Sequence, residues 1–324
     1  MMTTLSLARM LRSAGISAPR SAAAGRSPLL APRWYAHGFN RPVVYRAAGI
    51  AAAALPRRAR LRLAVAIAAV VARRFSVERA VVSANVARIL PHATPADRAA
   101  LVGDVFRNFA VCFADLIAAN RRALRLGPLL AGVDGLPHLN AAARSGRGIV
   151  VLTAHLGNWE LAGRLLALQG GRPTHVVVAA DQDPGVEHFL RDAPAPVRFV
   201  VRRDHTSALP LLAALRRGEV VAMQGDRALG TRGDVAVPFF GADARFPLGP
   251  FVLARAAGVR VVPSFCVLGA DRRYTIEVSE PIDVPPGGEH AALARWVAVL
   301  ERVVRAHPEQ WFNFFDVWSG APAH

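Results

Sequence analysis

A histidine directly after a strongly apolar run is the residue in this chain best placed to do chemistry. The run Gly148 to Leu152 leads through Thr153-Ala154 into His155, and Glu160 follows five positions later. Continuous apolarity of this kind is typical of a strand that is buried on both faces. The intervening Gly157-Asn158 favours a turn and the start of a helix. The pattern therefore predicts a strand, a turn that carries the histidine, and a helix that begins near the glutamate.

The spacing limits how His155 and Glu160 can meet. If both were helical, five residues would place them about 140° apart around the axis. They meet only if His155 lies on the turn and Glu160 in the first helical turn. Glu160 would then accept one imidazole N–H and leave the other nitrogen free to act as a general base. The alternative is that the helix dipole alone favours Glu160 at this position and that the histidine bonds to backbone.

A second group of polar residues follows the strand expected at 219–224. It comprises Gly225-Asp226-Arg227, then Arg232, and then Phe240-Gly241 within a long stretch without clear periodicity. Long irregular loops in compact domains are usually functional. Arginines in such a loop can bind a phosphate or stabilise an oxyanion. In the alternative interpretation, Asp226 and Arg227 form a local ion pair and the glycines only turn the chain.

The composition excludes several chemistries. The 324-residue chain carries a formal charge of +17, and all 40 of its Lys+Arg residues are arginine. Without lysine there is no Walker A phosphate lysine and no Schiff base. The sequence also lacks Gly-x-Ser-x-Gly and His-Glu-x-x-His, and no third metal ligand accompanies His155 and Glu160. We therefore expect no metal and no nucleotide cofactor.

The basic charge points to a partner of opposite sign. No zinc spacing and no basic-plus-aromatic motif favours nucleic acid. An acidic protein or an anionic membrane surface fits the charge at least as well. Cys112 and Cys266 lie in apolar segments, so we expect small core residues and no disulfide.

The N-terminal region is predicted to be basic and membrane-proximal. Residues 1–38 are rich in Ala, Ser and Arg and are expected to form a disordered extension, superficially like a transit peptide. Residues 39–126 are expected to be helical. Their apolar runs 47–55 and 63–72 are shorter than the roughly 20 residues that span a bilayer. Flanking arginines suit helices that lie in the membrane interface, whereas a buried helix hairpin is the alternative.

Residues 127–324 are predicted to form an α/β domain. The expected strands are 148–153, 175–180, 197–202, 219–224, 260–268 and 273–279. The expected helices are 158–169, 184–191, 206–217, 248–257 and 289–306. Alternation of strands and helices predicts a mostly parallel central sheet covered by helices on both faces.

Four motifs together resemble one known family. They are His155-x-x-x-x-Glu160, Gly225-Asp226-Arg227, Pro238-Phe239-Phe240-Gly241 and Pro308-Glu309-Gln310-Trp311. In this order they look like the bacterial lipid A late acyltransferases, the lauroyl/myristoyl transferases, within the broader His-x4-acid glycerolipid acyltransferases. The likeness begins near Leu55-Pro56-Arg57 and runs to Trp318.

The resemblance implies an enzyme at the cytoplasmic face of a bacterial inner membrane. It would transfer a fatty acyl group from an acyl carrier protein thioester to a hydroxyl of a lipid or glycolipid, as in lipid A acylation. By this resemblance His155 is the base and Glu160 its partner, and Gly157, Asn158, Asp226, Arg227, Arg232, Phe240 and Gly241 belong to the substrate site. The carrier protein of such enzymes is acidic, which suits the arginine-rich chain.

The chain departs from that family's pattern at two places. Asp226-Arg227 stands where lipid A members commonly have Asp-Gln, and the segment after Trp311 is aromatic where they commonly have His and Arg. These departures leave open a different acceptor, such as another glycolipid, a polyene lipid or an amino-acid lipid. A lipid hydrolase that uses the same dyad on water, and a membrane-bound scaffold, are further alternatives. The aromatic segment could lie at the membrane interface, but we favour its packing as a cap on the core.

Overall fold

The computed structural model describes most of the chain. The described ranges are 42–119, 126–144, 146–170, 172–179, 197–202 and 208–319. They all lie within the unit Arg33–His324. The proposed extension 1–38 and the expected helix 184–191 lie outside the described residues, so both stay predictions.

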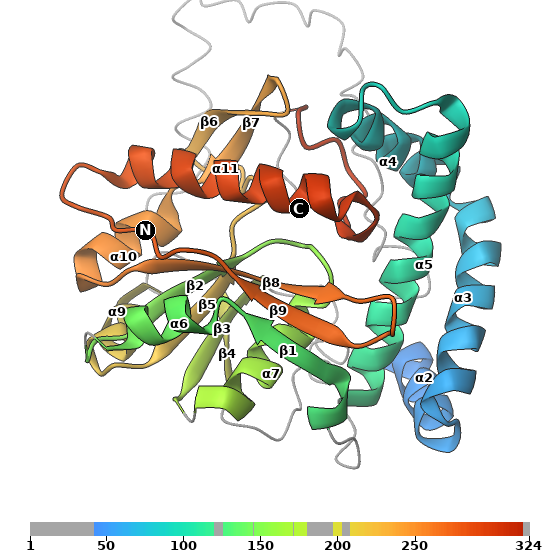
Figure 1. Cartoon of the computed structure of the whole chain (residues 1–324), viewed down its shortest axis with the longest axis horizontal. Coiled ribbons are helices and arrows are strands. Elements are labelled where there is room, and N and C mark those ends of the chain that lie inside the picture. The colour runs from blue at the N-terminus through green and yellow to red at the C-terminus, as the bar shows by residue number, and fades with distance from the viewer. Residues whose placement is uncertain are drawn as a thin grey trace, which may run out of the picture. The chain divides into compact units, whose positions relative to one another are not determined.

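A seven-stranded sheet forms the centre of this unit (Figure 1). Its spatial order is β1-β9-β8-β2-β5-β3-β4. The strands are β1 Leu130–Asp134, β2 Ile149–Thr153, β3 Thr174–Ala179, β4 Val197–Arg202, β5 Val220–Gln224, β8 Val261–Leu268 and β9 Tyr274–Val278. The run β8-β2-β5-β3-β4 is parallel throughout, and β9 is antiparallel to β8. The mostly parallel sheet is confirmed, and the six expected strands begin and end within one residue of their predicted bounds.

Helices pack on both faces of the sheet because successive strand residues point to opposite sides. Val150 and Leu152 of β2 enter one apolar cluster, and Ile149 and Val151 enter another. The first cluster contains α9 Ala208–Arg216, α10 Gly249–Ala257 and α11 Glu289–Ala306. The second contains α5 Pro95–Ala119, α6 Leu136–Ala143 and α7 Trp159–Gly170.

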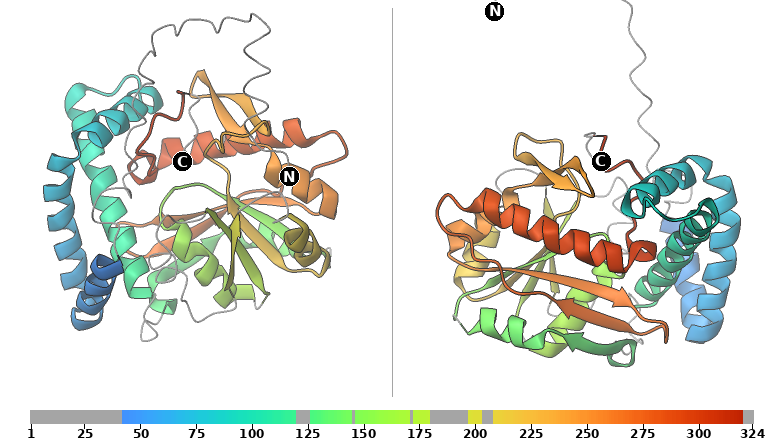
Figure 2. Two further views of the ribbon diagram at one scale, coloured as in Figure 1. Left: turned by 180° about the vertical axis from the view of Figure 1, so that it is seen from behind. Right: turned by 45° about the horizontal axis from the view of Figure 1, so that its top comes forward.

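The residues described between 42 and 119 form four α-helices, which include the two predicted apolar runs. They are α2 Pro42–Ala54, α3 Arg57–Arg74, α4 Ser76–Ile89 and α5. Helix α5 lies between the sheet and α3, so α3 has an outward side (Figures 1 and 2). On that side Leu63, Ile67 and Val70 are 46%, 53% and 62% exposed. None of the helices described is both long and apolar enough to cross a bilayer.

The segment after β5 corrects one prediction. Most of the expected irregular loop is a two-stranded hairpin of β6 Asp234–Phe239 and β7 Ala242–Pro247. Its turn places Phe240 at φ 49° and Gly241 at φ 77°, the pair of positive values that a tight type I′ hairpin requires. The sequence prediction also missed β1 and α6. The cause of the hairpin error is that β6 and β7 carry proline and charged residues, so their alternation is weak.

Candidate active site

The predicted strand-turn-helix places His155 at the end of β2, on the turn before α7. The turn is held by its neighbours: the Gly157 N–H donates to the Gln310 carbonyl at 2.9 Å, and the Asn158 N–H to the Cys266 carbonyl at 2.8 Å. Gly157 has φ 59°, and a Cβ there would lie 2.0 Å from the Cys266 carbonyl oxygen. Only glycine fits at this point, so its presence is explained by backbone packing.

Asn158 is a buried residue that shapes the same turn. Its side-chain carbonyl accepts the Leu161 N–H at 3.3 Å and so caps the first turn of α7. Its amide donates to the Cys112 carbonyl at 3.0 Å and to the Tyr274 hydroxyl at 3.1 Å. Gly157 and Asn158 thus have positioning roles in the structure, and their predicted contact with substrate stays a prediction.

The carboxylate bonded to the imidazole belongs to Asp226. Its Oδ1 lies 2.7 Å from His155 Nδ1, and its Oδ2 accepts the His155 backbone N–H at 3.1 Å. Asp226 follows β5, which is hydrogen-bonded to β2, so the carboxyl ends of two adjacent parallel strands bring the pair together. With Nδ1 facing the carboxylate as donor, the imidazole keeps Nε2 as the nitrogen that takes a proton.

Asp226 is completely buried and surrounded by donors. In addition to His155, its Oδ2 accepts Trp311 Nε1–H and Asn313 Nδ2–H, each at 3.2 Å. Burial by itself would raise the pKa of Asp226, but the charge and hydrogen bond of His155, together with Arg227 and Asn313, hold it well below its usual range. The side chain is therefore ionised and oriented for the imidazole.

This geometry corrects the pairing expected from the His-x4-Glu spacing. Glu160 is in the first turn of α7, as predicted, but the Nδ1 partner is Asp226 and not Glu160. Glu160 acts on Arg164, one helical turn further along: burial lowers the pKa of Arg164, and the charge of Glu160 opposes that shift. Spacing in the sequence could not reveal the Asp226 contact, because it joins residues 71 positions apart.

Arg227 supplies positive charge close to the imidazole. Its Nε donates to Asn313 Oδ1 at 2.8 Å, and its NH2 group donates to the Phe312 carbonyl at 2.9 Å. Burial lowers the pKa of His155, Arg227 lowers it further, and Asp226 acts in the opposite direction. The net effect is a His155 pKa below its ordinary value, so the neutral, proton-accepting form is favoured at neutral pH.

Three predicted substrate residues lie elsewhere. Arg232 is exposed, in a loop closed by Asp234, which accepts the Thr231 N–H at 3.0 Å. Phe240 and Gly241 form the hairpin turn, where the Phe240 N–H donates to Glu301 at 3.0 Å and Arg305 lies over the Phe240 ring. These contacts account for Phe240 structurally, and a role for any of the three in binding stays a prediction.

The C-terminal motif contributes to the site in a way the sequence prediction missed. The Phe312 N–H donates to the His155 carbonyl at 2.8 Å, while Trp311 and Asn313 reach Asp226. Gln310 exchanges two hydrogen bonds with the backbone of Leu268, at 2.8 and 2.9 Å. Residues 310–313 therefore lock the histidine turn and its carboxylate together, and the buried Phe312 and Phe314 confirm the predicted core cap.

A buried polar chain supports the turn from the other side. The Tyr274 hydroxyl accepts from Asn158 and donates to Asp115 Oδ2 at 2.9 Å. Asp115 is fully buried and pairs with Arg57 at 2.7 Å and Arg60 at 3.4 Å. This chain fastens the turn to α3 and α5.

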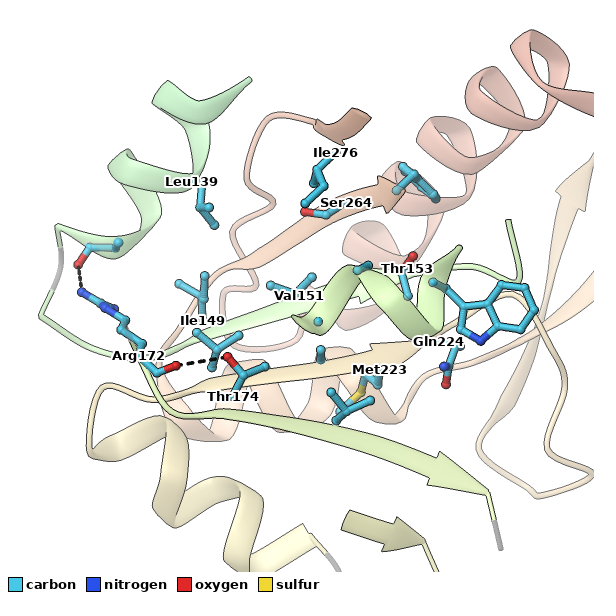
Figure 3. A pocket seen from close by; sticks show the side chains of 18 of the residues that line it. Leu139, Ile149, Val151, Thr153, Arg172, Thr174, Met223, Gln224, Ser264 and Ile276 are labelled. Atoms are coloured by element: carbon cyan, nitrogen blue, oxygen red, sulfur yellow. Dashed lines mark hydrogen bonds between the residues drawn. The ribbon is translucent and has the colours of Figure 1, made fainter. Parts of the chain in front are cut away.

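An apolar cavity runs beside the histidine turn, between the sheet and helices α6 and α7. Its volume is about 340 Å³. At one end it is lined by Thr153, Gln224 and Trp159, whose ring centroid lies 5.0 Å from that of His155. Figure 3 shows it extending past Val151 and Ile149 to Arg172. The histidine turn therefore lies beside one end of an apolar cavity.

The chain is similar in sequence to known acyltransferases. The family model for bacterial lipid A biosynthesis acyltransferases matches residues 41–319. A phosphatidylinositol mannoside acyltransferase of Mycobacterium tuberculosis (strain CDC 1551 / Oshkosh) is 30% identical over 190 residues, 57% of this chain and 59% of that relative. A lipid A biosynthesis lauroyltransferase of Escherichia coli (strain K12) is 25% identical over 238 residues, 64% of this chain and 75% of the relative. The chain thus spans less than two thirds of the mycobacterial relative's own length.

Proposed function

Because the chain belongs to the bacterial lipid A biosynthesis acyltransferase family, we propose that it transfers a fatty acyl chain from an acyl carrier protein thioester to a hydroxyl of a lipid or glycolipid. The observation that carries the proposal is the His155–Asp226 pair, which lies next to Trp159 at one end of an apolar cavity. A base for an alcohol and a space for a hydrocarbon chain are the two things such a transfer needs.

In the proposed reaction His155 is the general base. Its neutral Nε2 takes the proton of the acceptor hydroxyl as the oxygen bonds to the thioester carbonyl carbon. The carbon–sulfur bond then breaks, and the proton passes from the imidazolium to the departing thiolate. Ionised Asp226 holds the tautomer and stabilises the imidazolium, as the acid of a catalytic triad does.

The oxyanion that forms during attack requires positive charge or N–H donors. Arg227 is the proposed source, because its charge already acts on His155. The proposal keeps a role for Glu160, in altered form. Through its charge on Arg164 it would help to position the first turns of α7, and it would not orient the imidazole itself.

The acceptor is proposed to be a glycolipid hydroxyl, on two grounds. Relatives are named for lipid A biosynthesis and for phosphatidylinositol mannoside. The Asp226-Arg227 pair and the aromatic segment after Trp311 distinguish this chain from the usual lipid A pattern, and Asn313 in that segment bonds to both Asp226 and Arg227. The departures from the usual lipid A pattern therefore lie within the site itself.

We further propose that the α3 apolar face (Leu63, Ile67 and Val70) rests on an anionic bilayer. These side chains recur at helical spacing, and exposed arginines occupy both ends of the helix, for example Arg62 and Arg73. Apolar side chains enter the headgroup boundary while guanidinium groups bind lipid phosphates. This location would bring a lipid acceptor to the enzyme.

Vesicle flotation tests the membrane proposal. Ile67→Glu should reduce binding to vesicles that contain phosphatidylglycerol, while Leu209→Glu should not, since Leu209 is 69% exposed but lies on α9. Equal binding by both variants and the unaltered chain would contradict an interfacial role for α3.

The catalytic proposal is tested with acyl carrier protein loaded with a labelled fatty acid and a total lipid extract as acceptor. The chain should produce labelled lipid, and His155→Ala should produce none while it retains the circular dichroism of the unaltered chain. Free fatty acid without acylated lipid would favour the hydrolase alternative. Full turnover by His155→Ala would exclude the base assignment.

A further inference from the structure

A charged side chain lines the far end of the apolar cavity. Arg172 lies between α7 and β3, at the edge of the sheet opposite the histidine turn, and it lines the cavity. We propose that Arg172 sets the maximum length of the acyl chain that the enzyme transfers. This inference rests on the proposed function, since it assumes that the cavity holds the acyl chain.

The cavity runs along β2, so its far end can limit the length of an acyl chain that enters it. Its lining residues Thr153, Val151 and Ile149 are alternate positions of β2 that point to one face of the sheet. From Thr153 to Ile149 the strand rises about 13 Å at its usual spacing. Figure 3 shows Thr153, Val151 and Ile149 in succession between Gln224 and Arg172. A chain whose carbonyl lies at His155 would therefore extend along β2 and direct its methyl end at Arg172.

The guanidinium is fastened at this end by backbone carbonyls. It donates to the carbonyl of Ala143 at 3.0 Å, and to those of Arg147 and Gly218 at 3.4 Å. The three carbonyls belong to the end of α6, the approach to β2 and the approach to β5. A methyl group that advanced further would have to displace a charged donor from these acceptors without replacing its hydrogen bonds, which is unfavourable in a partly buried site.

The cavity volume also limits the chain. An engineered apolar cavity of about 150 Å³ binds benzene, which has six carbons. On that scale the volume of about 340 Å³ holds on the order of a dozen carbons. A medium-length acyl chain fills the cavity, and a longer chain meets Arg172.

Two substitutions at the cavity end should shift chain preference in opposite directions. Arg172→Ala removes the closing side chain, so the preferred donor should lengthen by about two or more methylenes, the order of the arginine stem that is lost. Ala143→Leu, also in the cavity lining, adds bulk near the same end and should shorten it. Each methylene of the acyl chain that a variant admits to the apolar cavity or excludes from it should change the relative kcat/KM by about fourfold.

The experiment measures transfer from a series of saturated acyl carrier protein thioesters of increasing length, with one acceptor extract. Arg144→Ala is the matched control, because it removes an exposed arginine next to Ala143 that does not line the cavity. It should keep the unaltered profile. If Arg172→Ala folds poorly, Arg172→Lys, which keeps the charge on a smaller head, should lengthen the preference by a smaller step.

The outcomes separate the two proposals. Longer preferred chains in Arg172→Ala and shorter ones in Ala143→Leu support the length limit. An unchanged profile in folded, active Arg172→Ala and Arg172→Lys would overturn it and leave the acyltransfer proposal standing. Absence of transfer from every thioester by the unaltered chain would instead remove the proposed function on which the inference rests.

Discussion

Replacing Asp226 by asparagine is the most direct test of how the site works. The substitution preserves shape but removes the charge and converts one acceptor oxygen into a donor. Asp226 now accepts N–H groups from the His155 backbone, His155 Nδ1, Trp311 and Asn313. An amide cannot accept all four. If its NH2 group faces the imidazole, Nδ1 becomes the acceptor, and the proton moves to Nε2, where a base is needed.

The expected loss follows from that tautomer change. The same carboxylate-to-amide substitution in a serine-protease triad lowers kcat by about 10⁴ with the geometry intact. A loss of about 10³ to 10⁴ here corresponds to about 4 to 5.5 kcal/mol of transition-state stabilisation. Stability should also fall by about 1 to 3 kcal/mol, because at least one buried N–H loses its acceptor.

Glu160→Gln is the matched control, since it makes the same chemical change in the carboxylate that the sequence spacing singles out. Transfer kinetics should be measured with both variants, and the pKa of His155 by NMR of its ring nitrogens. Asp226 raises the pKa of His155 in the structure, so Asp226→Asn should lower it, and Glu160→Gln should leave it nearly unchanged.

The result that refutes this reasoning is specific. If folded Asp226→Asn keeps more than about a tenth of the activity, an effect under about 1.4 kcal/mol, while Glu160→Gln shifts the pKa of His155, then the imidazole is oriented by Glu160 during catalysis. The acidic limb of the unaltered enzyme's pH–rate profile should also lie below 6.5, because burial and Arg227 lower the pKa of His155. A limb above that value would contradict the neutral base.

Three further predictions concern the turn and its support. Gly157→Ala should destabilise the chain by more than about 2 kcal/mol in denaturant unfolding. Gly241 is the control: it has φ 77° and no atom within 4 Å of a Cβ built there, so Gly241→Ala should cost only the strain of a positive φ, about 1 kcal/mol. Equal losses of stability in the two variants would contradict the close contact between Gly157 and the Cys266 carbonyl. Tyr274→Phe should lower the unfolding free energy by about 1 to 3 kcal/mol and reduce kcat, and unchanged stability would show that the hydroxyl is not needed by its buried partners. Burial raises the pKa of Cys266 to about 12 and that of Cys112 well above its usual value, so the native chain should resist iodoacetamide at pH 8 and react after unfolding, as mass spectrometry would show.

The sequence predicts the central sheet well for a physical reason. Parallel strands buried on both faces are continuous apolar runs, and β2 and β8, which are buried at every position, stand out in this way. Edge and hairpin strands are half exposed, so β1 and the β6–β7 pair carry polar residues, glycine and proline and lack a clear signal. The prediction is accurate where burial alone determines the pattern.

Some contacts of the site could be predicted from local sequence signals, and others could not. His155 could be predicted because strand, turn and helix are consecutive in the chain and each has a local signal. Asp226 and Asn313 are brought to it by strand pairing and by the C-terminal segment, and neither contact leaves a trace in spacing. A five-residue spacing drew attention to Glu160, although the partner of the imidazole comes from the adjacent strand.

The two carboxylates with no exposed surface explain why the histidine turn is polar yet rigid. Asp115 and Asp226 both lie at 0% exposure, and they approach the turn from different sides. Asp115 is already neutralised by Arg57 and Arg60 at 2.7 and 3.4 Å, so its contact through Tyr274 is a positioning one.

Asp226 instead accepts hydrogen bonds from the neutral indole of Trp311 and the neutral amide of Asn313, and the charge of Arg227 also lowers its pKa. A carboxylate held in this way is stabilised most when a cation forms beside it, and in the proposed reaction the imidazolium of His155 is that cation. The same environment that keeps Asp226 ionised in the resting protein therefore stabilises the charge that catalysis creates. If Asp226 were instead hydrogen-bonded to a guanidinium, as Asp115 is, its charge would be neutralised, and His155 would lose the negative charge that stabilises its imidazolium.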